Sequence, residues 1–165
     1  NKRVRVKFSN GRAISGEVLA SHVARDIAIV ETEPQPGFGL PIRLDTPAVG
    51  SRVFVIGSPL GTEQAGSVTS GIVSALRDYP RKNPNSFSGK FIQSDVTVNH
   101  GNSGGPMFDD RGNVVGLTDL ALPGQDGRAV GVNLFIPIAD GLEKLGITVD
   151  NASAAAPTKT SAQKR

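Results

Sequence analysis

The sequence predicts an all-β protein, and three observations support this prediction. Short apolar runs alternate with turn signals along the chain, which is the pattern of β-sandwiches and β-barrels. Glycine is abundant, with 20 copies, and proline is frequent, with 11, as a fold with many tight turns requires. One short segment near the end, Ala139–Leu145, predicts a helix, and Gly146 is placed to end it.

The N-terminal part predicts a hairpin followed by a third strand. Lys2–Ser9 alternates basic and apolar residues, which indicates a half-buried strand with one solvated face. Asn10-Gly11 is a strong hairpin signal, after which Ile14–Ala20 is expected to pair back. Asp26–Thr32 predicts a more continuously apolar strand. The segment from Glu33 to Pro41 is rich in proline and glycine and predicts a surface connection.

The rest of the chain predicts six more strands. They are Arg52–Gly57, Val68–Leu76, Lys90–Ser94, Met107–Phe108, Val114–Leu122 and Ala129–Ile138. A polar loop, Asp78–Gly89, precedes the third of these strands. The adjacent aspartates Asp109 and Asp110 predict a hairpin turn rather than a metal site. Because the chain from Asn151 onward is rich in Ala, Ser, Thr and Lys, we expect a domain of residues 1–150 and a flexible tail of residues 151–165.

Composition narrows the classes of function. The formal net charge is +3, and the three excess positive charges, Lys159, Lys164 and Arg165, all lie in the tail. The positive and negative charges of the rest of the chain cancel. The overall positive charge therefore does not indicate a nucleic-acid partner. The absence of cysteine excludes disulfides and zinc–thiolate sites. No apolar run is long enough to span a membrane.

The most informative motif is Gly101-Asn102-Ser103-Gly104-Gly105-Pro106. A glycine-rich turn of this kind can expose one serine hydroxyl and let backbone N–H groups converge nearby, which is what acyl transfer needs. The same residues also satisfy G-x-S-x-G, the nucleophile elbow of α/β-hydrolases. That alternative requires a helix and a histidine after the serine, whereas strand signals and no histidine follow Ser103.

Three stretches resemble HtrA-type (DegP-like) serine proteases of the chymotrypsin-like superfamily. Phe91–Leu117 resembles the nucleophile region, Arg25–Val30 the catalytic-acid strand, and Ile56–Gly61 with Val68–Ala75 the opening of the second barrel. The resemblance covers nearly the whole chain except the tail. It implies a chymotrypsin-like double β-barrel. Since the chain is some tens of residues shorter than that fold usually needs, we expect the first barrel to be incomplete.

The same resemblance implies a Ser-His-Asp triad. Ser103 matches the nucleophile, and Asp26 matches the acid that orients the imidazole. The backbone at Gly101, Asn102 and Ser103 matches the oxyanion hole. No residue matches a metal ligand, and no metal or organic cofactor is expected.

The resemblance also implies which residues bind substrate: Val98, Asn99, Leu134 and Phe135. No carboxylate lies among them, which favours a small or medium apolar side chain on the N-terminal side of the cleaved bond. Phe135 departs from the relatives, which usually carry alanine there. The alternative for this lone phenylalanine is packing in the core.

The triad histidine is the residue that the chain does not obviously supply. His22 lies four residues before Asp26, too close to reach Ser103 while Asp26 supports its other nitrogen. His100 falls within the serine turn, and both histidines are expected to be surface or turn residues. We therefore expect the chain to be an N-terminally truncated part of a longer protein whose general base lies upstream. Asp95 is expected to support the turn rather than to serve as a second acid.

The function implied is that of a serine endopeptidase, which hydrolyses polypeptide substrates through an acyl-enzyme. The alternative is a catalytically inactive, protease-like module that binds polypeptides. A glutamyl-endopeptidase relative is a weaker third interpretation, since that group tends to carry Ser-Gly-Ser-Pro in the motif. The resemblance favours an extracytoplasmic location, such as the bacterial periplasm or cell envelope. It is compatible with a homo-oligomer, with a further domain beyond either terminus, and with regulation through the loops Asp78–Gly89 and Leu122–Arg128.

Overall fold

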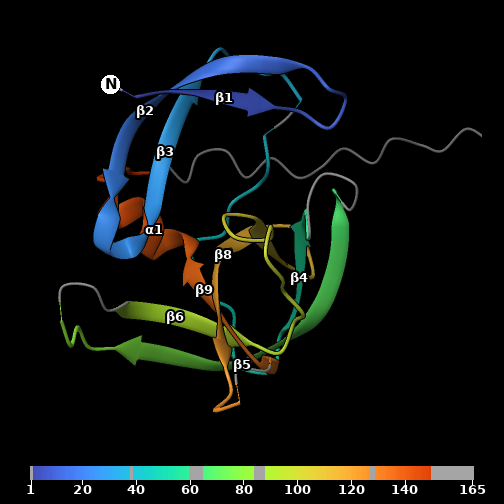
Figure 1. Ribbon diagram of the computed structural model, residues 1–165, viewed down its shortest axis with the longest axis vertical. Coiled ribbons are helices and arrows are strands. Elements are labelled where there is room, and N and C mark those ends of the chain that lie inside the picture. The colour runs from blue at the N-terminus through green and yellow to red at the C-terminus, as the bar shows by residue number, and fades with distance from the viewer. Residues whose placement is uncertain (1, 38, 60–64, 84–87, 127–128, 150–165) are drawn as a thin grey trace, which may run out of the picture.

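The structure, a computed structural model, describes residues 2–37, 39–59, 65–83, 88–126 and 129–149. It has two parts, a three-stranded sheet and a closed six-stranded barrel (Figure 1). Among the described residues, the only α-helix is α1 (Ile138–Lys144), which lies between the two parts. No helix in this part of the chain is long and apolar enough to cross a membrane. The all-β prediction is confirmed.

The sheet consists of β1 (Arg3–Lys7), β2 (Ala13–His22) and β3 (Ile27–Thr32), in that order and antiparallel. Lys7 pairs with Ala13 across a turn in which Gly11 has a φ of 84°, so the predicted Asn10-Gly11 hairpin is confirmed. The basic residues of β1 are exposed and its valines are half-buried, as the alternation predicts. The described strands of this sheet do not close into a barrel.

Asp26 is not the first residue of a strand, as the sequence suggested. One turn of 3₁₀ helix, η1 (Val23–Arg25), follows β2, and Asp26 ends it in the left-handed conformation with a φ of 51°. Its N–H donates to the carbonyl of Val23 at 3.1 Å. Aspartate is among the few residues that tolerate this conformation, because its short polar side chain can hydrogen-bond locally. β3 therefore begins one residue later, at Ile27.

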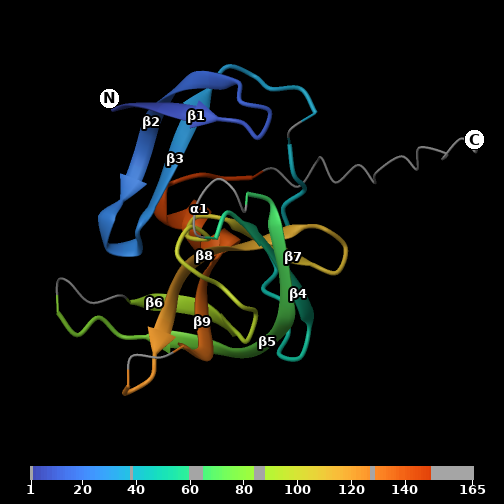
Figure 2. The same cartoon turned by 45° about the vertical axis from the view of Figure 1, so that its right-hand side comes forward.

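The barrel contains six antiparallel strands in the order β4-β5-β6-β9-β8-β7, and pairing of β7 with β4 closes it. Figure 2 shows these two strands side by side. Closure leaves no strand edge unpaired, which is how small barrels satisfy their backbone groups. The strands are β4 (Arg52–Gly57), β5 (Ser67–Tyr79), β6 (Gly89–Ser94), β7 (Pro106–Asp109), β8 (Val114–Pro123) and β9 (Ala129–Pro137).

The hydrophobic core lies inside this barrel. Its main cluster of buried side chains is Val53, Val55, Val73, Ile92, Val96, Met107, Val115 and Phe135. Side chains alternate along strands, so Phe91, Leu134 and Ile136 lie on the opposite face of β6 and β9 and form a second cluster. Ile27 of β3 packs against this second cluster. The sheet is thus joined to the barrel through apolar contact next to Asp26.

Two predicted loops are shorter than expected. Asp78 and Tyr79 extend β5 and pair with Lys90 and Gly89. β8 includes Leu122, as the predicted strand Val114–Leu122 has it, and extends to Pro123. These residues are part of the sheet because they pair with residues of the neighbouring strand, although the local composition favours a loop. Residues 84–87, residues 127–128 and the predicted tail, residues 151–165, lie outside the described residues.

The turn between β7 and β8 is held by Asp109, whose side chain is only 3% exposed. Its Oδ1 accepts hydrogen bonds from the backbone N–H groups of Arg111 and Asn113, at 3.0 and 2.9 Å. Its Oδ2 pairs with Arg43 at 2.8 Å. Burial by itself would raise the pKa of Asp109, but the hydrogen bonds from Asn113 and Arg111 and the charge of Arg43 outweigh it and lower the pKa. The predicted hairpin turn is confirmed.

Asp109→Asn is expected to lower the free energy of unfolding at pH 7 by about 1–3 kcal/mol, because it leaves Arg43 and the turn amides with a weaker acceptor. The folded-state pKa of Asp109 lies below its ordinary value, so this stabilisation is present above that value and is lost as pH falls. Urea unfolding at pH 7 and at pH 3 measures the difference from wild type, which should shrink at pH 3. Asp110→Asn, at the exposed neighbouring position, is the control. A difference that is the same at both pH values would contradict this account.

Candidate active site

Ser103 is exposed at the tip of a turn that precedes β7, and backbone hydrogen bonds hold that turn against β8. The N–H of Gly104 donates to the carbonyl of Thr118 at 2.8 Å. The N–H of Thr118 in turn donates to the carbonyl of Gly105, also at 2.8 Å. Because both partners are main-chain groups, the position of Ser103 does not depend on side-chain rotamers.

Close backbone packing fixes the other side of the turn. A Cβ atom at Gly105 would lie 2.6 Å from the carbonyl oxygen of Ile56 and 2.8 Å from that of Asn102, so only glycine fits there. Asn102 is 4% exposed and its side chain rests against Gly57, the last residue of β4, where a Cβ atom would also clash. The turn is therefore enclosed between the end of β4 and the middle of β8.

Two backbone N–H groups of the turn remain available. Those of Gly101 and Ser103 donate no hydrogen bond to any residue that the structure describes. The N–H of Asn102 differs, because it donates to the carbonyl of Asn99 at 3.0 Å. Of the three residues predicted for the oxyanion hole, two thus have free donors and the third, Asn102, has its donor engaged inside the turn. Gly101 has a φ of 100°, which glycine adopts without strain.

A hollow of about 410 Å³ lies beside Ser103. The Ser103 hydroxyl donates to the backbone carbonyl of Asp119 at 3.3 Å, at the wall of this hollow. Two of the four predicted substrate-binding residues, Val98 and Asn99, line it. The other wall residues come from the turn and from β8: His100, Thr118, Asp119, Leu120, Ala121, Leu122 and Pro123.

Leu134 and Phe135 do not line the hollow, contrary to the sequence interpretation. Both side chains are fully buried, at 0% exposure. β9 lies between β6 and β8, and both of its faces are covered, so Phe135 enters the barrel core and Leu134 packs on the outer cluster. The alternative considered for Phe135, core packing, is the one observed.

The sequence interpretation missed β8 as a wall of the hollow, and with it a carboxylate, Asp119. The predicted hairpin between the strands after Ser103 could have indicated this wall. Because Pro106 and Leu117 pair across the β7–β8 hairpin, the next residues of β8 necessarily run alongside the serine turn. His100 was recognised as part of the turn but not as a lining residue.

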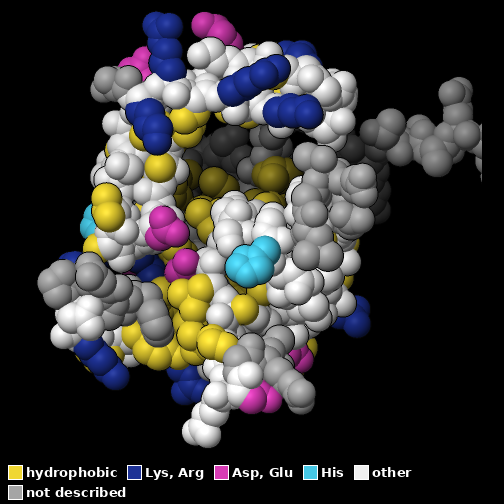
Figure 3. Space-filling view, in the orientation of Figure 1, with side chains coloured by type: hydrophobic (Ala, Val, Ile, Leu, Met, Phe, Trp, Pro, Cys, Tyr) yellow, Lys and Arg dark blue, Asp and Glu magenta, His cyan; other side chains and the backbone are white. Residues whose placement is uncertain are grey.

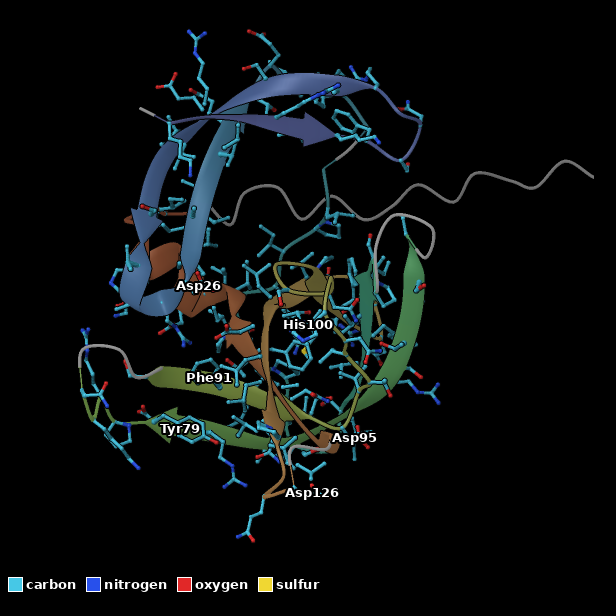
Figure 4. All side chains as sticks on the ribbon, viewed as in Figure 1. Asp26, Tyr79, Phe91, Asp95, His100 and Asp126 are labelled. Carbon is cyan, nitrogen blue, oxygen red and sulfur yellow. The ribbon has the colours of Figure 1, made fainter. Side chains whose placement is uncertain are left out.

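Asp26 lies at the end of the sheet that faces the barrel, and the serine turn with His100 lies across from it (Figure 4). The charge of Asp26 reaches the carboxyl group of Asp119, a residue of the hollow's wall. Burial raises the pKa of the Asp119 carboxyl; the positive charge of Arg25 opposes this rise, and the negative charge of Asp26 adds to it. Ser103 bonds the backbone carbonyl of Asp119, whereas Asp26 acts on its side-chain carboxyl. Asp26 is exposed, and Arg25 pairs with Asp140 rather than with Asp26.

Neither histidine forms a hydrogen bond with the Ser103 hydroxyl in the described part of the chain. His100 is exposed in the turn, and His22 is the last residue of β2, with its Nδ1 buried and unpartnered among the described residues. Asp95 accepts the backbone N–H of Ile72 at 2.7 Å, which ties β5 to the segment before the turn. Among the residues described, no group of three or more His, Cys, Asp or Glu side chains could hold a metal ion.

The two parts of the molecule leave a recess between them (Figure 3). The serine turn offers an exposed hydroxyl and two backbone N–H groups that donate to no described residue, and Asp26 lies across from His100 of that turn (Figure 4). A hydroxyl nucleophile and convergent N–H groups are the elements that acyl transfer uses. A carboxylate placed to orient an imidazole completes the set when the imidazole is supplied.

Comparison with known proteins agrees with this chemistry. Residues 1–117 match the family of trypsin-like peptidase domains. The chain is 37% identical over 142 residues to a probable periplasmic serine endoprotease, DegP-like, of Ectopseudomonas mendocina, covering 84% of the chain and 28% of the relative. It is 35% identical over 141 residues to a putative serine protease, HhoA, of Synechocystis, covering 82% of the chain and 34% of the relative. The chain thus spans about a third or less of the length of these relatives.

Solved structures with the same architecture are also similar. An HtrA-type protease, AlgW, solved with a decapeptide matches with a TM-score of 0.73 and 27% identity, over 87% of this chain and 43% of that one. A serine endoprotease from Yersinia pestis matches with a TM-score of 0.67 and 28% identity, over 86% of this chain and 47% of that one. The double-barrel interpretation of the fold is confirmed by these matches.

Gly105→Ala tests the close packing of the serine turn. The added methyl group would meet two backbone carbonyls that cannot rotate away, so we expect the free energy of unfolding to fall by about 1–3 kcal/mol. Gly39→Ala is the matched control, because a Cβ atom there meets nothing within 4 Å; we expect a change below about 0.5 kcal/mol. Urea unfolding measures both. Equal stability of the two variants would show that the turn is not packed as described.

Proposed function

Because the chain belongs to the family of trypsin-like peptidase domains, we propose that it carries the reactive centre of an HtrA-like serine endopeptidase. The observation that carries the proposal is the exposed Ser103 hydroxyl in a turn where the backbone N–H groups of Gly101 and Ser103 donate to no residue that the structure describes. Both residues are exposed, so their N–H groups are open to the carbonyl oxygen of a substrate.

In this proposal Ser103 attacks the carbonyl carbon of a peptide bond while a general base takes its proton. The Gly101 and Ser103 N–H groups stabilise the negative oxygen of the tetrahedral intermediate, whose collapse expels the amine and leaves an acyl-enzyme. Water then attacks the acyl group and regenerates the serine. Asp26 orients and stabilises the imidazole of the general base. Since neither His22 nor His100 hydrogen-bonds Ser103 in the described part of the chain, the proposal takes this imidazole from elsewhere in the natural gene product.

The proposed substrates are polypeptides. Support comes from the similar HtrA-type protease solved with a decapeptide, and from relatives that are named endoproteases. The periplasmic name of several relatives supports an extracytoplasmic location for this chain as well. We also propose that residues 1–150 form the protease domain and that residues 151–165 form its tail or linker.

One prediction of the proposed function concerns the nucleophile. A fluorophosphonate probe is expected to label Ser103 of the natural gene product, located by mass spectrometry of the labelled peptide, because only an activated serine reacts. Asp26→Asn should slow labelling by about 10²–10⁴-fold, since the imidazole loses its orienting carboxylate. Ser103→Ala should abolish it.

Two controls accompany this experiment. Ser74→Ala removes an exposed serine of β5, outside the site, and His100→Ala removes the imidazole nearest the turn; both variants should still be labelled. If the natural gene product is not labelled at Ser103, the endopeptidase proposal fails and the inactive, polypeptide-binding alternative takes its place.

Another prediction of the proposed function concerns substrate preference. The walls of the hollow beside Ser103 carry apolar side chains from Val98, Leu120 and Leu122, which favour an apolar residue before the cleaved bond. The one carboxylate residue of the described lining, Asp119, already interacts with the charge of Arg25. Matched peptides that differ only at that position should therefore be cleaved at least about tenfold faster with Val or Leu than with Lys.

A variant sharpens this test. Ala121→Asp places a carboxylate on the exposed wall of the hollow and should move the preference toward Lys. Val130→Asp adds the same charge at an exposed position of β9 outside the hollow and should leave the preference unchanged. Equal shifts in both variants would mean that the hollow does not select the side chain.

A further inference from the structure

Arg25 is a buried cation that the proposed chemistry does not use. Its side chain is 4% exposed, and its Nε forms an ion pair with Asp140 at 2.7 Å. Its terminal nitrogens donate to two backbone carbonyls, Nη1 to Ser88 at 3.1 Å and Nη2 to Lys90. Its Cζ atom lies 4.1 Å from the centroid of the Phe91 ring. A guanidinium tolerates such burial only when its donors are matched in this way.

All of these partners belong to the other part of the fold. Arg25 is the last residue of η1, in the connection between β2 and β3 of the sheet. Lys90 and Phe91 belong to β6, and Asp140 belongs to α1. Figure 1 shows α1 and β6 next to the end of the sheet that carries this connection. Arg25 is therefore a polar link from the sheet to the barrel, made of one ion pair and two hydrogen bonds.

The residue on the other side of Asp26 is held by the same part of the barrel. Ile27 packs against the cluster that contains Phe91, and its Cδ1 atom lies next to Gly141 of α1. Asp26 thus lies between two residues that are both attached to the barrel. Its own backbone is in the left-handed conformation, with a φ of 51°, which directs the chain between these two attachments.

We propose that Arg25 is a positioning residue for Asp26: by binding Asp140 and the carbonyls of β6, it holds the carboxylate of the sheet at a fixed place relative to Ser103 of the barrel. This inference rests on the proposed function, because it assigns Arg25 a role in the same reaction. Catalysis by a triad is sensitive to such placement, since a displacement of about 1 Å can cost about 10²-fold in rate.

A second ion pair in the same chain provides a control, although its arginine is more exposed, at 34% against 4% for Arg25. Arg43 pairs with Asp109 at 2.8 Å, and this pair joins a connecting segment to β7 within the barrel. Breaking it removes an arginine–aspartate pair of nearly the same length without loosening the sheet. Arg25→Met and Arg43→Met can therefore be compared at a temperature where both proteins are folded.

The test is the rate at which a fluorophosphonate probe labels Ser103 in the natural gene product. Arg25→Met should lower this rate about 10–100-fold, and Arg43→Met should change it by less than about threefold. Asp140→Asn, which keeps the arginine and weakens only the ion pair, should lower the rate in the same direction by a smaller factor. It also keeps the proposal testable if Arg25→Met does not fold.

A double-mutant cycle separates positioning from general support of the structure. If Arg25 acts through Asp26, Arg25→Met should cost less than about threefold when Asp26→Asn is already present. If the same factor is lost in both backgrounds, Arg25 does not act through Asp26 and the inference is overturned. Wild-type labelling of Arg25→Met, or an equal loss in Arg43→Met, would overturn it as well.

Hydrogen exchange of the Asp26 amide gives a readout that does not require activity. This N–H is bonded to the carbonyl of Val23, so its exchange reports the stability of the η1 turn. We expect Arg25→Met to speed its exchange at least about tenfold relative to Arg43→Met. If wild-type protein is not labelled by the probe, the proposed function fails while this measurement still decides whether Arg25 holds the turn. Equal exchange in the two variants would overturn the inference.

Discussion

The site depends on main-chain contacts between the serine turn and its two neighbouring strands. Gly104 and Gly105 exchange backbone hydrogen bonds with Thr118 of β8, and Gly105 lies against the carbonyl of Ile56 at the end of β4. No side chain separates these backbones, so the turn has little room to relax. The closed barrel fixes the positions of β4 and β8. The turn that packs between them is therefore also held in a fixed position.

The second component of the site comes from a different part of the fold. The barrel buries most of the apolar side chains, whereas the strands of the sheet are mainly half-buried or exposed. Ile27 and Arg25 attach the sheet to the barrel on either side of Asp26. A reactive centre divided between two units is only as well ordered as the contacts between those units, which is why a buried arginine beside the acid matters.

Much of the fold could be predicted from local patterns. Within the described residues, nine strands and one α-helix all lie close to the predicted ranges, because alternation, glycine turns and helix-end signals act over a few residues. The errors occur where tertiary contacts override local preference. Asp26 leaves the strand to end a 3₁₀ turn, and Asp78 and Tyr79 join β5 because β6 offers them partners. Leu134 and Phe135 are buried because neighbouring strands and side-chain clusters cover both faces of β9.

The sequence by itself determined the all-β class, the strand pattern and the serine turn, since each follows from residues adjacent along the chain. It also indicated Asp26, through its resemblance to a catalytic-acid strand. Only the tertiary structure decided which residues surround Ser103, placing Asp119 and Leu120 of β8 there. It alone paired Arg25 with Asp140, 115 residues away. The physical reason is that such contacts depend on barrel closure and on how the sheet packs against it, and no local sequence pattern encodes a distance between strands that are remote in the chain.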